Sequence, residues 1–220
     1  LRNAKRPLIL MGRVSRSQAG WRERIALAEA LNARVLTDSK IAAAFPTRHP
    51  LYASHASMMP SEETLKVVAQ ADVILSLDWV DLGGTLKSAY QRREIAAKVI
   101  SISPDQLVHG GWNMDYQSLP PVDINYVTTP EMAVGALLAA VNEVAPPKHA
   151  VWEDFPPLTW PPLERSEGQE KLRVSDIAAT LAEAVAGRES CIIRHPFAWA
   201  SHFWPVSHPL DMLGYDGGGG

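Results

Sequence analysis

Short apolar runs at regular intervals constrain the fold of this chain more than any other feature. They are PLILMG at 7–12, RVLTD at 34–38, DVILSLD at 72–78 and KVISISP at 98–104. Each run is almost continuously apolar and closes on a glycine, an aspartate or a proline, which is typical of a strand buried on both faces of a parallel sheet. A fifth run, VDINYVTT at 122–129, also predicts a strand.

Helical patterns fill the intervals between these runs. Apolar residues recur at helical spacing over 18–33, 61–71, 83–97 and 129–144. Their ends carry helix signals, with Ser61 as a cap, Asn32 as a stop, and Thr129 as a cap before Pro130. Strands that alternate with helices predict an α/β fold, a doubly wound, Rossmann-like parallel sheet with helices on both faces and right-handed crossovers.

The pattern divides the chain into three parts. Residues 1–145 are expected to form the α/β domain, and 146–170 a proline-rich linker, because 146–162 hold six of the 17 prolines. Residues 171–220 predict a second α/β segment that is incomplete. It begins with a helix over 173–187, with Ser175 as its cap and Gly187 as its stop, and continues with a buried strand at 190–196.

Composition excludes several classes of function. A net charge of −3 provides no field that would hold nucleic acid or an anionic membrane. No apolar run approaches the roughly 18 residues that a membrane-spanning helix needs. The single cysteine, Cys191, allows no disulfide and no cysteine-based zinc site within the chain, which fits a cytoplasmic protein, and its apolar neighbours predict a buried thiol.

In doubly wound sheets, ligands bind beyond the carboxyl ends of the strands, so the loops after residues 11, 77 and 102 are the places to search. After the first strand, Gly12 and Arg13 precede a helix and offer backbone amides and a guanidinium to a phosphate. Gly83 and Gly84 form a second pair where a backbone can approach a ligand closely. Tight strand-to-helix turns explain both glycine sites equally well.

Two further groups of polar residues are candidates for a functional site. Asp78 and Asp81 follow the third strand, where they serve either as an acid–base pair or, more commonly, as turn and helix caps. His195, His202 and His208 are spaced six or seven residues apart, which matches no helical zinc pair and predicts separate loop histidines.

Several of these segments together resemble the central domain of the thiamine diphosphate-dependent enzymes typified by acetolactate synthase, benzoylformate decarboxylase and oxalyl-CoA decarboxylase. The resemblance covers residues 5–145 and is carried by the order and spacing of RPLILMGRVSRSQAGWRERIALAEALNARVLTD, FPTRHPLY, AQADVILSLD and KVISISPDQL. The linker and the stretch HPFAWASHFWPVSHPLDMLGYDGGGG look like the start of that family's third, cofactor-binding domain.

The resemblance implies thiamine diphosphate and Mg²⁺ as cofactors, and a lyase or transferase that breaks or makes a carbon–carbon bond beside the carbonyl of a 2-keto acid or related substrate. It implies that Gly217, Gly218, Gly219 and Gly220 approach the thiamine cofactor. The family's activating glutamate and magnesium motif match no segment of 1–220. We therefore expect a fragment without catalytic residues of its own, partnered by the remaining domains in a homo-oligomer, a dimer or tetramer.

Some members of the family also bind FAD or ADP on the central domain. Here alanine and serine in YASHAS (52–57), Asp78 after its strand and Ser103 in SISPDQ depart from those members, because they crowd a flavin and remove an acid that would meet a ribose. We expect an empty nucleotide site. The alternative is a free-standing module that binds FAD, ADP or NAD on the loops carrying Gly12, Gly83 and Ser103.

Overall fold

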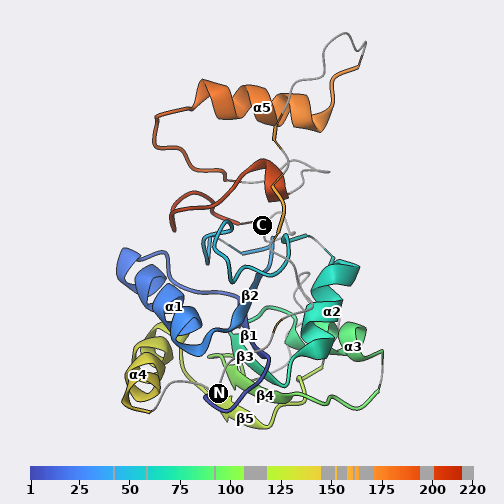
Figure 1. Ribbon diagram of the computed structural model, residues 1–220, viewed down its shortest axis with the longest axis vertical. Coiled ribbons are helices and arrows are strands. Elements are labelled where there is room, and N and C mark those ends of the chain that lie inside the picture. The colour runs from blue at the N-terminus through green and yellow to red at the C-terminus, as the bar shows by residue number, and fades with distance from the viewer. Residues whose placement is uncertain are drawn as a thin grey trace.

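Five parallel strands form one sheet in the order β2–β1–β3–β4–β5 (Figure 1). The strands are β1 (Pro7–Met11), β2 (Arg34–Thr37), β3 (Val73–Leu77), β4 (Lys98–Ile102) and β5 (Ile124–Tyr126). In this computed structural model the described residues are 1–41, 43–57, 59–91, 93–106, 118–144, 152, 158–160, 162–163, 171–193 and 201–214. Met11 pairs with Leu77 and Leu77 with Ile102, so β1, β3 and β4 end at one level.

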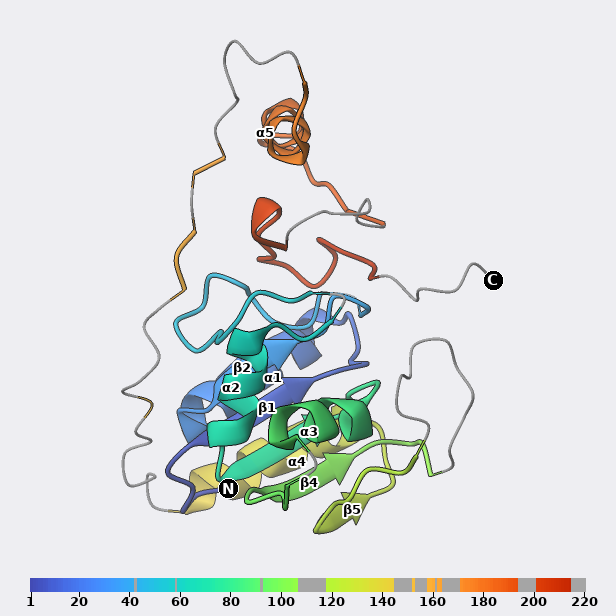
Figure 2. The ribbon, with the colours of Figure 1, turned by 90° about the vertical axis from the view of Figure 1, so that its right-hand side faces the viewer.

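Helices cover both faces of the sheet, α1 (Gln18–Leu31) and α4 (Pro130–Glu143) on one side and α2 (Glu62–Gln70) and α3 (Leu82–Tyr90) on the other (Figures 1 and 2). Alternate residues of β1 serve opposite faces: Ile9 and Met11 pack toward α1 and α4, whereas Leu8 and Leu10 pack toward α2 and α3. The predicted doubly wound α/β fold is confirmed.

The helix ends largely follow the sequence signals. The Ser61 hydroxyl accepts a hydrogen bond from the amide of Thr64 at 3.2 Å, and Asn32 ends α1 with a left-handed φ of 47°. Thr129 precedes α4 with Pro130 as its first residue. Two boundaries were predicted wrongly. Helix α3 ends at Tyr90, because Gln91 turns left-handed at φ 50°, and the last strand keeps three residues of the eight expected.

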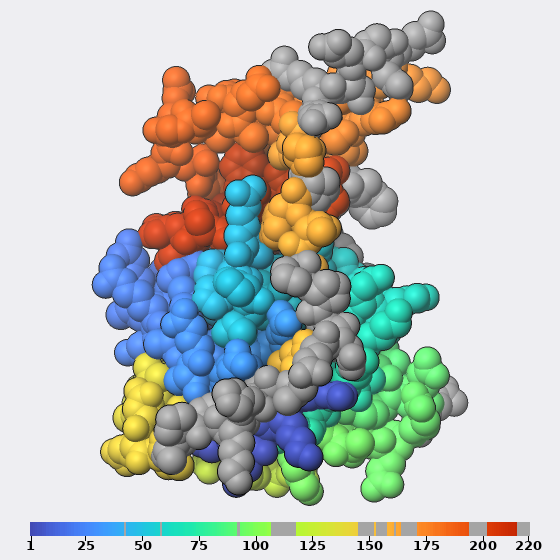
Figure 3. Space-filling model, in the orientation of Figure 1, coloured from blue at the N-terminus to red at the C-terminus, as the bar shows by residue number. Residues whose placement is uncertain are grey.

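The segment 201–214 lies against the loop that follows β2 (Figure 3). The Thr47 amide donates to the Val206 carbonyl at 3.0 Å, and the Val206 amide donates to the Thr47 hydroxyl at 2.9 Å. Val206 and Met212 share a small buried cluster with Trp21 and Ala43. This segment is therefore fastened to the α/β domain by both backbone hydrogen bonds and apolar packing.

Helix α5 (Val174–Ala184) lies beyond that segment, away from the sheet (Figure 1). Its cap was predicted wrongly: the helix begins one residue before Ser175, and its N-cap is Arg173, whose amide donates to the Asp176 carboxylate at 2.7 Å. It also ends three residues before Gly187.

The buried strand expected after α5 is wrong over its described residues. Cys191 is exposed and Ile193 is 71% exposed. Ile192 makes an isolated bridge to Met212, and one bridge does not build the sheet that would bury this run. No helix in the described part of the chain is long and apolar enough to cross a membrane.

Candidate functional site

The strand order reverses between β1 and β3, and this creates a crevice at the carboxyl edge of the sheet. β1 has β2 on one side and β3 on the other, so the connections that leave β1 and β3 run on opposite faces of the sheet. In open α/β sheets this switch point is where ligands bind. It brings together the residues that follow β1, β3 and β4, as the sequence predicted.

Gly12 fixes how closely the ends of β1 and β3 approach each other. Its amide donates to the Leu77 carbonyl at 2.9 Å, and the Arg13 amide donates to the Asp78 carbonyl at 2.9 Å. A Cβ on Gly12 would lie 2.0 Å from the Asp78 carbonyl oxygen, which is part of the backbone. The two amides that the sequence offered to a phosphate are thus used to join the two strand ends.

Asp78 is the centre of a polar network at the switch point. It is buried and holds a left-handed φ of 56°. Its Oδ1 accepts hydrogen bonds from Arg13 Nη2 at 2.8 Å and from the Ser103 hydroxyl at 2.6 Å. Arg13 also pairs with Asp105, whose amide donates to the Ser103 hydroxyl at 3.0 Å. We call Arg13, Asp78, Ser103 and Asp105 the switch-point network.

The charges in this network favour the arrangement in which Arg13 is paired with both Asp78 and Asp105. Burial by itself lowers the pKa of Arg13, but the hydrogen bonds and charges of Asp105 and Asp78 outweigh that effect and raise the pKa above its ordinary value. One cation faces two carboxylates, so the three groups together carry one negative charge. A phosphate entering here would have to separate Arg13 from both partners, which costs the hydrogen bonds to charged groups that hold it.

Asp81 has a different task from Asp78. Its Oδ1 accepts a hydrogen bond from the Gly84 amide at 3.0 Å and so caps α3. A Cβ on Gly84 would lie 2.2 Å from the same carboxylate, so this glycine makes room for the cap. Gly83 is buried and lines a cavity. The two aspartates do not form an acid–base pair, because one joins the switch-point network and the other caps a helix.

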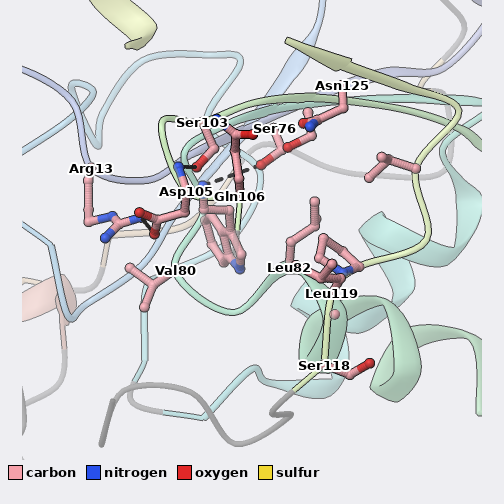
Figure 4. Close-up of a pocket in the computed structure, with 15 residues that line it drawn as sticks. Arg13, Ser76, Val80, Leu82, Ser103, Asp105, Gln106, Ser118, Leu119 and Asn125 are labelled. Atoms are coloured by element: carbon pink, nitrogen blue, oxygen red, sulfur yellow. Dashed lines mark hydrogen bonds and ion pairs between the residues drawn. The ribbon is translucent and has the colours of Figure 1, made fainter. Parts of the chain in front are cut away.

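A cavity of about 250 Å³ lies next to the network, between the ends of β3, β4 and β5 and the start of α3 (Figure 4). Ser76, Ser101 and Asn125 line its sheet side, and Leu82, Leu119 and Val122 contribute apolar surface. This row of polar side chains was not predicted from the sequence. A signal was available, since β3 (VILSL) and β4 (KVISI) each carry a serine at the fourth position, between apolar residues.

His202 lies in a short 3-10 helix, η1 (Ser201–Phe203), rather than in the loop that was expected, and His208 lies in the turn that follows it. The His202 ring lies 5.6 Å from that of His55 and 4.5 Å from that of Phe203, whereas His208 Nε2 lies 2.9 Å from the Gln18 amide nitrogen. No group of three or more histidine, cysteine or acidic side chains suited to a metal ion occurs among the described residues. His195 and Gly217–Gly220 lie outside those residues.

Comparisons with known proteins identify relatives of this domain. Residues 1–119 match a family model described as the thiamine pyrophosphate enzyme, central domain. Sulfoacetaldehyde acetyltransferase of Alcaligenes xylosoxydans xylosoxydans is 36% identical over 107 residues, which are 48% of this chain and 18% of that protein. The matched region is thus a small part of the relative.

Solved structures share the fold at low sequence identity. Benzoylformate decarboxylase from Polynucleobacter necessarius superposes with a TM-score of 0.67 at 19% identity, and 4-hydroxybenzoylformate decarboxylase from Rhodococcus jostii RHA1 superposes with 0.58 at 20% identity. Each comparison covers 96% of this chain and 38% of the other. The chain therefore spans well under half the length of these structures.

Proposed function

Because the chain belongs to the thiamine pyrophosphate enzyme family, whose central domain it matches over residues 1–119, we propose that it braces the other domains of a larger enzyme. That enzyme would be a lyase, decarboxylase or synthase acting on 2-keto acids or related carbonyl compounds. The observation that carries the bracing role is the switch-point network. Its polar groups bind one another where a ligand would otherwise bind, and so they stiffen the sheet edge.

The residues that bind the cofactors of the proposed enzyme lie outside the described part of this chain. Thiamine diphosphate held by Mg²⁺ supplies an electron sink for carbon–carbon chemistry beside a carbonyl. The described residues hold no acidic or histidine cluster that would fit the metal. We propose that Gly217–Gly220 approach the thiamine side, and that 171–220 begin the cofactor-binding domain. The rest of that domain, a further domain and a second copy of the chain complete the oligomer.

The catalytic proposal is tested on residues 1–220 alone. We expect this chain, mixed with thiamine diphosphate, Mg²⁺ and a panel of 2-keto acids, to release no carbon dioxide above the cofactor-only background. The physical reason is that thiamine catalysis needs a carboxylate, a metal and an apolar wall to converge on one cofactor. A full-length relative assayed in parallel is the positive control. Turnover above background would contradict the bracing role, and Asp78, Asp81 and His208 would then be mutated first.

A nucleotide-binding module is the second candidate, and the cavity beside the switch-point network is the observation that favours it. We expect FAD, ADP and NAD each to bind residues 1–220 no more tightly than about 1 mM, because Arg13 is held by two carboxylates and the amides of Gly12 and Arg13 are already bonded to the end of β3. Isothermal titration calorimetry measures this. Binding in the micromolar range would instead establish an open nucleotide site.

A further inference from the structure

Three polar side chains form a row across neighbouring strands at the floor of the cavity. Ser76 of β3 pairs in register with Ser101 of β4, and Ser101 with Asn125 of β5. The Ser76 hydroxyl accepts a hydrogen bond from the Trp79 amide at 3.3 Å. The side chains of Ser101 and Asn125 make no hydrogen bond with the described residues; Ser101 is 6% exposed, and Asn125 is exposed at the edge of the sheet. The Ser101 hydroxyl is not one of the fully buried unpaired atoms of the described residues, so it opens onto the cavity and is available to a hydrogen-bonding ligand.

The surface around this row is mainly apolar, and its aromatic side chain is held in place. Trp79 lines the cavity, and its indole is held by a 2.9 Å hydrogen bond from Nε1 to the Thr85 hydroxyl. Leu82 and Leu119 line it across from Ser76 and Asn125 (Figure 4). A hydroxyl and a carboxamide set among aromatic and aliphatic side chains suit a planar ring that carries a polar edge.

The charges around the cavity disfavour an anion. Among the described residues, Arg13 and Asp105 are the charged side chains that line the cavity, and they pair with each other. Asp78 pairs with the same Arg13 guanidinium and adds a further negative charge. An anionic ligand would therefore meet a region of net negative charge whose cation is already bound, whereas an uncharged ligand would not.

We propose that this cavity binds a small uncharged aromatic amide or heterocycle, whose polar edge bonds to Ser101 and Asn125 and whose ring packs against Trp79. The inference rests on the proposed closure of the switch-point network to phosphates. The size fits one ring or two fused rings, because about 250 Å³ lies below the roughly 300–1,000 Å³ of most drug-sized sites. The amide group matches the donor and acceptor capacity of the Asn125 carboxamide.

The test compares matched pairs of probes that differ only in charge. Benzamide and nicotinamide are titrated into residues 1–220, and benzoate and nicotinate serve as their anionic counterparts. Two-dimensional NMR follows the backbone amides of Ser101 and Asn125 and the indole signal of Trp79, which Trp79→Phe assigns. We expect saturable shifts at these signals with the amides, and affinity at least about tenfold lower for the carboxylates, a difference of about 1.4 kcal/mol.

Substitutions in the row supply the second readout. Asn125→Ala and Ser101→Ala are each expected to weaken benzamide binding about fivefold, the effect of one lost hydrogen bond. Ser88→Ala, in a separate cavity on α3, is the control and should leave the affinity unchanged. The inference is overturned if the amides do not saturate these signals, if the carboxylates bind equally well, or if Asn125→Ala has no effect. Micromolar binding of ADP would instead overturn the closed network on which the inference rests.

Discussion

Gly12→Ala is expected to lower the free energy of unfolding by about 3 kcal/mol or more. The new Cβ would lie 2.0 Å from the Asp78 carbonyl oxygen and 2.5 Å from the Trp79 Cα, and neither atom belongs to a side chain that can rotate away. The ends of β1 and β3 would have to separate, which breaks the two amide hydrogen bonds that join them. Urea unfolding followed by circular dichroism measures the change.

Gly135→Ala is the matched control for that measurement. Gly135 lies within α4, and a Cβ there would meet its nearest neighbour, a Glu23 carboxylate oxygen, at an ordinary 3.7 Å. Alanine in a helix interior is favoured over glycine by about 0.5–1 kcal/mol, so this variant should be slightly more stable than the parent. If Gly12→Ala stayed within about 1 kcal/mol of the parent, the close approach of the two strands would be disproved.

The elements that depend on local signals could be predicted from the sequence. Runs such as PLILM and VILSL are apolar throughout because both faces of the sheet are covered, and the caps at Ser61 and Asn32 are written in single residues. The buried strand expected at 190–196 failed over its described residues, because it depended on partners that the sequence pattern does not supply. Residues 190–193 have the composition of a buried strand, but burial requires neighbouring strands, and Ile192 has one isolated bridge to Met212.

The position of the candidate site could be predicted from the sequence, but the bonding of its side chains to one another could not. Strand ends placed Arg13, Asp78 and Ser103 at one edge, and the structure brings them into contact. These side chains bind one another because of the directions in which they point, which depend above all on the left-handed backbone of Asp78. No local sequence pattern predicts that backbone conformation. Glycine at 12 likewise fitted a phosphate turn and a close strand contact equally well, and the position of the Asp78 carbonyl favours the second.

Substitutions at Asp78 should separate the charge, the hydrogen bonds and the backbone strain of the switch-point network. Asp78→Asn tolerates the left-handed φ of 56° and keeps an acceptor for Ser103, so it should cost about 1 kcal/mol through the weakened contact with half-exposed Arg13. Asp78→Gly adopts the same φ but loses both side-chain hydrogen bonds, which should cost about 2 kcal/mol. Asp78→Ala loses them and adds left-handed strain, for about 3–4 kcal/mol.

The decisive result is the order of stability of the three variants, with Asp78→Asn the most stable, Asp78→Gly next and Asp78→Ala the least stable. Urea unfolding of the three variants side by side measures this order. Raising the ionic strength to about 1 M shortens the screening length to about 3 Å, so it should narrow the gap between the parent and Asp78→Asn more than the gap between Asp78→Gly and Asp78→Ala. Backbone strain at residue 78 would be refuted if Asp78→Ala were as stable as Asp78→Gly. Because Asp78→Gly also frees Arg13 from one of its two carboxylates, a parent-like stability of that variant would mean that the network does not brace the sheet edge at all.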